Sequence, residues 1–204
     1  MDEKLASYFL GAFRDGSAKC YNRGYEINIW QKNLEWLQKV QKIIGVLFEI
    51  SPPILKDRNG FRIRFNSKKV FSWLMESGFP KDGKHVFWNT PDLVKNNKSN
   101  FQHYVAGFFD AEGGVAKYKK FGKTYLRLDF YQSWNNKNGC PPLEDIKEFL
   151  QSAEINCGKV RSRKDNAFNK YPRYLFSISG SKSVSKFFKE IPILHPKKFC
   201  PADA

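Results

Sequence analysis

The feature that most constrains the fold is a short pattern that occurs twice, about half the chain apart. One copy is residues 104–114 (YVAGFFDAEGG) and the other is residues 7–17 (SYFLGAFRDGS). Each predicts a helix with small residues on one flank, where a second helix backbone can approach closely. Each helix then delivers an acid to its C-terminal end, followed by a glycine that can take a positive φ and stop the helix.

The two acids, Asp15 and Glu112, occupy matching places in the two copies. An acid at a helix C-terminus is disfavoured by the helix macrodipole, so its presence there indicates a role in holding a cation. Two such helices predict two related halves packed helix on helix, with one acid from each half at a shared centre.

The rest of the chain repeats the same order of elements, so each half is expected to be αββαββα in an α+β fold with antiparallel sheets. We expect an N-terminal half at 1–88, a linker at 89–99 and a C-terminal half at 100–204. In the first half the expected elements are a helix at 5–14, two strands within 18–31, a helix from 32 or 33 to 45, strands at 47–51 and 61–65, and a helix at 67–77. In the second half they are a helix at 100–111 capped by Asn100, strands at 114–120 and 124–133, a helix at 141–153, strands at 157–163 and 173–179, and a helix at 181–190.

The charge balance points to a polyanionic partner. The chain has 35 Lys and Arg against 20 Asp and Glu, a formal net charge of +15, and nucleic acid is the usual partner of such a chain. No apolar run is long enough to span a bilayer, and the start lacks the features of a signal peptide, so we expect an intracellular protein of an archaeal cytoplasm or an organelle. The four cysteines and three histidines are scattered, which argues against structural zinc and favours free thiols.

Cations alternate with apolar residues along several predicted strands. A sheet with one face packed on helices and the other carrying cations can lie in a DNA major groove. A solvated sheet face would alternate in the same way, but four strands that all favour cations make DNA binding the stronger interpretation. The candidate DNA-binding residues are Arg62, Arg64, Lys117, Lys119, Arg127, Arg161, Arg163 and Arg173.

Both repeated segments resemble the LAGLIDADG motif, and the whole chain resembles a single-chain, two-motif LAGLIDADG homing endonuclease. The second copy is close to the family pattern. In the first copy only four positions separate Gly11 from Asp15, against five from Gly107 to Glu112, and Arg14 stands where a small residue is usual. These departures predict a different packing register in the first helix.

The paired acids indicate the reaction. Two carboxylates can hold divalent cations against scissile phosphates, and Mg²⁺ prefers oxygen ligands and keeps waters that can supply the nucleophile, with Mn²⁺ able to substitute. Asp15 and Glu112 are therefore the expected metal ligands and catalytic residues. The resemblance implies a monomer whose two sheets form a saddle on double-stranded DNA, and a staggered double-strand break across the minor groove of a long target.

The resemblance also implies helpers around the acids. Gln31 and Gln132 fall where the family places a polar residue that orders water near the metal. The family places a lysine beside each scissile phosphate, after the last helix of each half. Lys84, or else Lys81, fits in the first half, and Lys197, or else Lys198, fits in the second.

Two other functions fit the same sequence. An RNA maturase of this family would bind and fold an intron RNA on the same scaffold, and a DNA-binding regulator would bind a specific site without nicking it. Retention of both Asp15 and Glu112 favours cleavage. The DNA target does not follow from the sequence, because base readout depends on strand curvature, water and DNA deformability.

Overall fold

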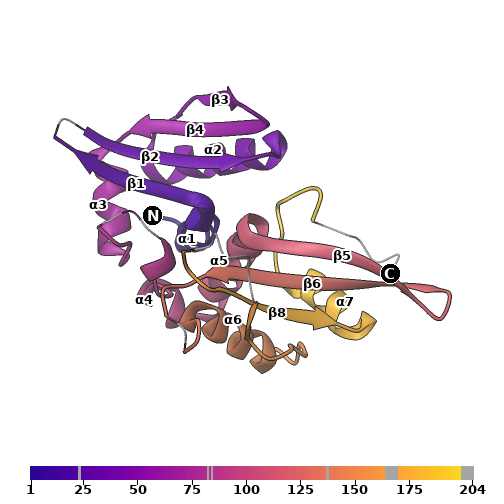
Figure 1. Cartoon of the computed structure of the whole chain (residues 1–204). Coiled ribbons are helices and arrows are strands. Elements are labelled where there is room, and N and C mark those ends of the chain that lie inside the picture. Colours follow the sequence, from indigo (N-terminus) through magenta and orange to yellow (C-terminus); the bar gives the residue numbers. More distant parts are fainter. Residues whose placement is uncertain (23, 82, 84, 137, 164–169, 199–204) are drawn as a thin grey trace.

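Two antiparallel sheets of the same topology organise the molecule (Figure 1). The structure is a computed structural model that describes all residues except 23, 82, 84, 137, 164–169 and 199–204. The first sheet has the order β1-β2-β4-β3 and the second the order β5-β6-β8-β7. The strands are β1 (Gly16–Tyr21), β2 (Gly24–Gln31), β3 (Ile54–Asp57), β4 (Gly60–Asn66), β5 (Gly113–Lys120), β6 (Lys123–Ser133), β7 (Arg161–Arg163) and β8 (Arg173–Ser179).

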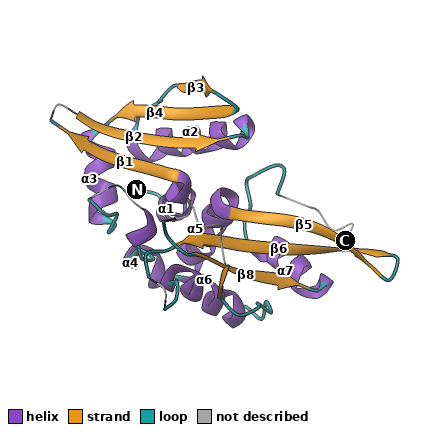
Figure 2. Cartoon of the chain, viewed as in Figure 1, coloured by secondary structure: helices purple, strands orange, loops and turns teal. Residues whose placement is uncertain are grey.

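Helices cover one face of each sheet and fill the space between the halves (Figure 2). Helices α2 and α3 contact the first sheet, α6 and α7 contact the second, and α1 packs along α5 where the halves meet. Their bounds are α1 (Glu3–Ala12), α2 (Leu34–Phe48), α3 (Lys68–Glu76), α5 (Lys98–Glu112), α6 (Pro141–Ser152) and α7 (Ser181–Glu190). The connection between the halves carries a 3₁₀ turn, η2 (His85–Phe87), and the short α4 (Asp92–Lys95). No helix in the described ranges combines the length and apolarity that crossing a membrane requires.

Side-chain caps start most of these helices. Ser67 accepts a hydrogen bond from the Val70 amide at the start of α3. The predicted cap of α5 was wrong: Asn97, not Asn100, accepts from the first amides of that helix. Asn100 lies inside α5 and donates to the Glu3 carboxylate at the start of α1, which ties the two central helices together.

One predicted strand, 47–51, was wrong. The apolar residues Ile43, Ile44, Leu47 and Phe48 keep a helical spacing and are all buried, so α2 continues to Phe48. It ends at Glu49, whose φ of 61° is left-handed. The strand that pairs with β4 at the edge of the first sheet is instead β3, and a tight turn at residues 58–59 joins the two.

The predicted strand at 157–163 is shorter in the structure. Regular pairing covers only Arg161–Arg163, and Cys157 forms an isolated bridge with Ile178. The remaining strands and helices lie within a few residues of their predicted positions.

Each half buries its own apolar layer between sheet and helices. In the second half the layer is aromatic: the Phe130 ring stacks on Phe176 at 4.8 Å between centroids and meets Phe109 at 5.1 Å. In the first half Ile27, Ile29 and Ile63 face the helices and are fully buried. The opposite face of each sheet is left uncovered by helices, so both sheets present a free outer face.

Candidate active site and nucleic-acid interface

The central helices touch backbone to backbone at Gly11 and Gly107. A Cβ built on Gly11 would lie 2.1 Å from the Tyr104 carbonyl oxygen, and one built on Gly107 would lie 2.0 Å from the Tyr8 carbonyl oxygen. Only glycine fits at either position, as the small-residue flanks predicted. This contact sets α1 and α5 side by side and brings their C-terminal ends together.

The missing residue of the first motif is absorbed by a change of helix type. After Ala12 the chain tightens into a 3₁₀ turn, η1 (Phe13–Asp15), whereas α5 stays α-helical to Glu112. A 3₁₀ turn rises about 2.0 Å per residue and an α-helix about 1.5 Å, so four steps from Gly11 and five from Gly107 both advance by about 7.5 Å. The predicted register change is therefore local, and the two acids lie at a similar distance along the helix axis from the glycine of their motif.

The glycine after each acid is needed for space. Gly16 and Gly113 have φ values of −101° and −81°, so the predicted positive φ was wrong. A Cβ on Gly113 would lie 2.3 Å from the Phe109 ring, and one on Gly16 would lie 2.6 Å from the Phe13 ring. The chain leaves each helix directly into the first strand of its sheet.

The two carboxylates form a charged centre that is partly buried. Burial raises the pKa of Asp15 well above its usual range, the charge of Glu112 raises it further, and Lys198 lowers it. Burial raises the pKa of Glu112 to about 6, against the opposing charges of Arg173, Lys198 and Arg14. Two adjoining carboxylates that repel each other favour a bound cation over two free charges.

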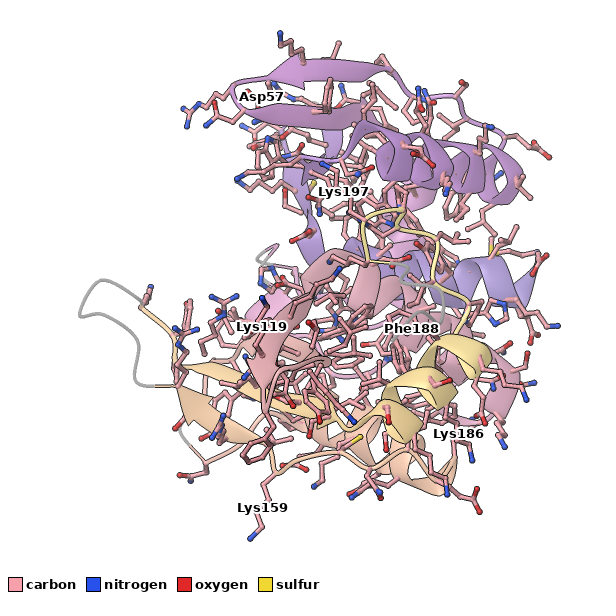
Figure 3. All side chains as sticks on the ribbon, turned by 90° about the vertical axis from the view of Figure 1, so that its right-hand side faces the viewer. Asp57, Lys119, Lys159, Lys186, Phe188 and Lys197 are labelled. Atoms are coloured by element: carbon pink, nitrogen blue, oxygen red, sulfur yellow. The ribbon has the colours of Figure 1, made fainter. Side chains whose placement is uncertain are left out.

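Lys198, rather than Lys197, reaches this centre. Its ammonium group donates to the carbonyl oxygens of Phe109, Asp110 and Ala111 at 2.9, 2.7 and 3.3 Å. Burial lowers the pKa of Lys198 to about 8, and the charges of Asp110, Asp15 and Glu112 raise it. Lys197 is exposed on the segment that crosses from α7 toward the first half (Figure 3). In the first half Lys84 lies outside the described residues, and Lys81 is exposed.

The two glutamines occupy equivalent positions but differ in their contacts. Gly16 pairs with Ile29 and Gly113 with Phe130, so Gln31 and Gln132 both lie two residues beyond the partner of the glycine. The Gln31 side chain donates to an Asp15 carboxylate oxygen at 3.0 Å. Gln132 is fully buried and donates to the Ser133 carbonyl, and its own side-chain oxygen has no hydrogen-bond partner.

Two buried charges that the sequence did not assign hold the centre in place. Arg14 donates to the carbonyl oxygens of Trp88 and Asn89 and to the Tyr104 hydroxyl, and it stacks over the Trp88 ring at 4.5 Å. Asp110 accepts from the Tyr8 hydroxyl at 2.5 Å and from the amides of residues 194 and 195.

The contacts of Arg14 and Asp110 occupy equivalent places in the two halves. Tyr8 and Tyr104 each lie three residues before the glycine of their motif, and each bonds a charged residue of the opposing motif. That residue then anchors the backbone that follows the last helix of a half, at 88–89 for Arg14 and at 194–195 for Asp110. One anchor donates to carbonyls and the other accepts from amides. The signal in the sequence was a charge inside each otherwise apolar motif.

The outer faces of both sheets are lined by polar and cationic side chains. In the first sheet the register places these residues together: Ser17, Lys19, Glu26, Asn28, Trp30, Arg62, Arg64 and Asn66. In the second sheet the corresponding set is Tyr118, Tyr125, Arg127, Asp129, Tyr131, Arg161, Arg163 and Arg173. Six of the eight predicted DNA-binding residues thus share the outer faces, and Arg173 also lies near enough to Glu112 to lower its pKa.

Lys117 and Lys119 do not lie on the outer face, contrary to the prediction. They pair with Leu126 and Thr124, and Leu126 is buried on the helix-covered side. Because successive side chains of a strand alternate, both lysines project from the reverse face of the hairpin. They are exposed there, and Figure 3 shows Lys119 on β5.

Among the described residues, Asp15 and Glu112 would supply only part of the ligand set of a metal at this centre. Within the described ranges no group of three or more His, Cys, Asp and Glu side chains gathers in a way that could hold an ion. Two carboxylates leave most positions of a six-coordinate cation open, which suits an ion shared with phosphate oxygens and water.

Paired helices that deliver one acid each between two sheets with cationic outer faces define the LAGLIDADG class of homing endonucleases. The chain is 34% identical over 206 residues to homing endonuclease I-ApeI of Aeropyrum pernix, a match that spans 97% of this chain and 85% of that protein. The chain therefore belongs to the homing endonuclease family. No protein-family model matches it.

Solved structures show the same fold. Homing endonuclease I-DmoI in complex with DNA and Mn superposes with a TM-score of 0.61 at 18% identity, covering 95% of this chain and 98% of that one. Meganuclease I-SmaMI bound to uncleavable DNA superposes with a TM-score of 0.58 at 12% identity, covering 96% and 86%. The predicted α+β architecture of two related halves is confirmed.

Proposed function

We propose that the protein is a site-specific DNA endonuclease that makes a staggered double-strand break in a long target. The observation that carries this proposal is the pairing of Asp15 and Glu112 at the ends of two packed helices, between sheets with cationic outer faces. The similarity to I-ApeI supports it. Structures of I-DmoI have been solved with DNA in the presence of Mn, Mg and Ca, which supports a divalent cation.

Mg²⁺ is the cation we propose, and the DNA contributes the remaining ligands. When bound, it would supply a Lewis acid at the scissile phosphate and an activated water. Asp15 and Glu112 would hold it, and Gln31 donates its amide to the Asp15 carboxylate and orients it. Lys198 places a positive charge beside both acids, which lowers the pKa of each and so favours the ionised forms that bind a cation. Hydrolysis adds water to phosphorus and breaks the bond to the leaving oxygen, which takes up a proton.

The sheets position the duplex for this step. Arg62 and Arg64 in one half, with Arg127, Arg161, Arg163 and Arg173 in the other, face outward and can contact bases and phosphates. The two halves of one chain supply the two acids, so we propose a monomer acting on double-stranded DNA inside the cell.

Replacing each acid by its isosteric amide tests the proposal. Asp15→Asn and Glu112→Gln each remove a metal ligand without adding bulk, so double-strand cleavage should fall by at least about 10³-fold, or about 4 kcal/mol of transition-state stabilisation. DNA binding should stay within a fewfold of wild type. The substrate is a plasmid carrying the junction formed by joining the sequences that flank this reading frame in its host gene, with Mg²⁺ present.

The controls separate the alternatives. A wild-type protein that binds this junction and never nicks it would be a binding protein, and the enzyme assignment would be wrong. Cutting of both strands at the normal rate by either amide variant would remove that acid from the reaction.

A further inference from the structure

The segment that carries Lys198 is held by the half of the molecule to which it does not belong. It follows α7 at the end of the second half, and Leu194 and His195 lie on it just before the lysine. The Leu194 carbonyl oxygen accepts a hydrogen bond from the Lys39 ammonium group of α2 at 2.8 Å. The His195 ring packs against the Trp36 ring of the same helix, with 6.0 Å between the centroids. Both contacts come from the first half.

A buried chain of hydrogen bonds joins the same helix to the same segment. The Trp36 indole N–H donates to the Tyr8 hydroxyl at 2.8 Å, and that hydroxyl donates to the Asp110 carboxylate at 2.5 Å. The same carboxylate oxygen accepts from the amides of Leu194 and His195 at 2.8 and 3.1 Å. Burial raises the pKa of Tyr8 well above its ordinary value, so the hydroxyl keeps the proton that it donates. The chain of bonds therefore runs from α2 through α1 and α5 to the segment.

Fixing residues 194 and 195 also fixes Lys198, because a tight turn joins them. The Lys198 amide donates to the His195 carbonyl oxygen at 3.0 Å. The turn directs the Lys198 side chain to the last carbonyls of α5, beside both acids. Lys197 lies on the same turn and is exposed. A shift of this turn would move the Lys198 ammonium group away from the acids.

The equivalent tyrosine of the second motif leads elsewhere. The Tyr104 hydroxyl accepts from Arg14, and Arg14 donates to the carbonyls of residues 88 and 89. Tyr8 and Tyr104 are both fully buried, and each bonds a charged residue of the opposing motif. The Tyr8 chain ends at the segment of Lys198, whereas the Tyr104 chain ends at the connection between the halves. Tyr104 is therefore a matched comparison for Tyr8.

We propose that the first half positions Lys198 of the second half for cleavage. Trp36, Tyr8 and Lys39 are positioning residues, because they fix the backbone at 194–195 and act on the reaction only through the lysine. The proposal rests on the proposed function, which gives Lys198 its part beside the acids. It adds a dependence of one half on the other: Lys198 reaches the acids only when the halves are docked in this arrangement.

A double-mutant cycle separates this role from a general contribution to stability. Tyr8→Phe removes the hydroxyl and keeps the ring, so the single-turnover rate of cleavage of the junction plasmid, with enzyme in excess, should fall about tenfold or more. In a Lys198→Met background the same change should alter the rate by less than about twofold, because the residue through which it acts is absent. Tyr104→Phe removes an equally buried hydroxyl, and its effect should be the same in both backgrounds.

Lys39 tests the proposal outside the core. Lys39→Met removes the bond to the Leu194 carbonyl and should slow single-turnover cleavage about threefold or more. Lys42→Met makes the same change in charge at an exposed position of the same helix, and should alter the rate by less than about twofold. Equal effects of the two changes would overturn the role assigned to Lys39.

Chemical labelling of Lys198 gives a readout that needs neither DNA nor metal. Reductive methylation of the free protein, followed by tandem mass spectrometry, measures the access of reagent to each lysine. Tyr8→Phe should release the turn and speed the labelling of Lys198 about fivefold or more, because local opening exposes its ammonium group. Labelling of the exposed Lys197 should stay the same, and Tyr104→Phe should leave the labelling of both lysines unchanged.

Additive effects of Tyr8→Phe and Lys198→Met on the cleavage rate would overturn the inference, as would unchanged labelling of Lys198 in the Tyr8→Phe protein. A wild-type protein that cuts no DNA would instead refute the proposed function. The labelling would still decide whether the first half holds the lysine in place.

Discussion

The ammonium group of Lys198 directs its hydrogen bonds to three successive carbonyls at the C-terminal end of α5. That end carries the negative pole of the helix and also Glu112. Lys198 therefore stabilises the helix end and lowers the pKa of both acids. It is held by the protein itself, so its charge is in place before DNA arrives.

We predict that Lys198→Met slows cleavage by about 10²-fold or more, and that Lys197→Met changes it by less than about threefold. The methionine keeps the length of the side chain but removes the positive charge beside the two carboxylates, so the slower rate should persist at saturating Mg²⁺. The measurement is the cleavage rate across a Mg²⁺ titration at pH 7, with binding followed separately. A larger effect from Lys197 would assign the role to the exposed lysine.

The pKa of Glu112 predicts a stability that falls as pH rises. Its folded value of about 6 exceeds the ordinary 4.5, so between these values the folded state keeps a proton that the unfolded state has lost. The stabilisation from the protonated acid is complete below about pH 4.5 and lost above about pH 6. At neutral pH the metal-free protein is therefore destabilised by the buried, ionised Glu112 carboxylate.

The change in the free energy of unfolding caused by Glu112→Gln should therefore be about 1–2 kcal/mol more favourable at pH 7.5 than at pH 4 in the metal-free protein. The measurement is urea unfolding of variant and wild type in EDTA at both values of pH. Mg²⁺ added at pH 7.5 should stabilise wild type more than the variant. An equal effect of the substitution at both pH values would mean that burial does not perturb this acid.

At the level of single residues, the sequence predicted what its own spacing encodes. Asp15 and Glu112 were found because they end repeated motifs, whereas Gln31, at the end of β2, was assigned from the family resemblance. Arg14 was noticed only as a departure from the motif. Its partners, Trp88, Asn89 and Tyr104, lie 74 to 90 positions away, so no local pattern could reveal them. Lys198 could not be distinguished from Lys197, because adjacent lysines differ mainly in where their side chains point, and the sequence does not encode that locally.

At the level of elements, the contact between α1 and α5 leaves no room for a side chain. We predict that Gly107→Ala destabilises the protein by at least about 3 kcal/mol, because the added Cβ would lie 2.0 Å from a backbone oxygen and the helices must separate. Separation also moves Asp15 away from Glu112, so cleavage should be lost as well. Urea unfolding and a cleavage assay measure the two effects.

Gly45→Ala is the matched control for this substitution. Gly45 lies in α2, and the nearest atom to its added Cβ is 3.7 Å away, which is ordinary contact. Alanine is the better helix former, so this change should stabilise the protein by up to about 1 kcal/mol. Similar losses for both glycines would show that the helix contact is not close.

Element types followed from periodicity, and the errors have physical causes. The apolar run at 43–48 fits a helix or a strand over a short window, and packing of α2 against the first sheet decided for helix. The 3₁₀ turn that ends at Asp15 compensates for the residue missing from the first motif. This compensation is recognised only by comparison with α5, which stays α-helical to its acid. Lys117 and Lys119 were assigned to the wrong face because the alternation of β5 alone does not say which face the helices cover.

At the level of the whole molecule, the net charge of +15 overstates what is free to meet DNA. Several outward-facing arginines are already paired with carboxylates on the same faces. Arg64 contacts Glu26 at 2.5 Å, Arg62 contacts Asp57 at 2.5 Å, and Arg127 contacts Asp129 at 2.9 Å. Each pair must open, or share its arginine, when a phosphate or base takes the guanidinium. The carboxylates thus weaken binding to DNA of any sequence. Specific contacts with the target must offset the free energy lost when these pairs open.

Glu26→Gln should release Arg64 and tighten binding to DNA of random sequence. One additional phosphate contact makes the salt slope steeper by about 0.9 units, so the gain should be several-fold at low salt and small at high salt. Glu154→Gln makes the same change in net charge and removes one of the two carboxylates that contact Lys186, the other being Glu190. Lys186 lies on α7, on the helix side of the second sheet (Figure 3). That control should leave the slope unchanged. If both variants steepen the slope equally, total charge governs binding, and the pairing on the outer face of the first sheet has no part in how the protein selects DNA.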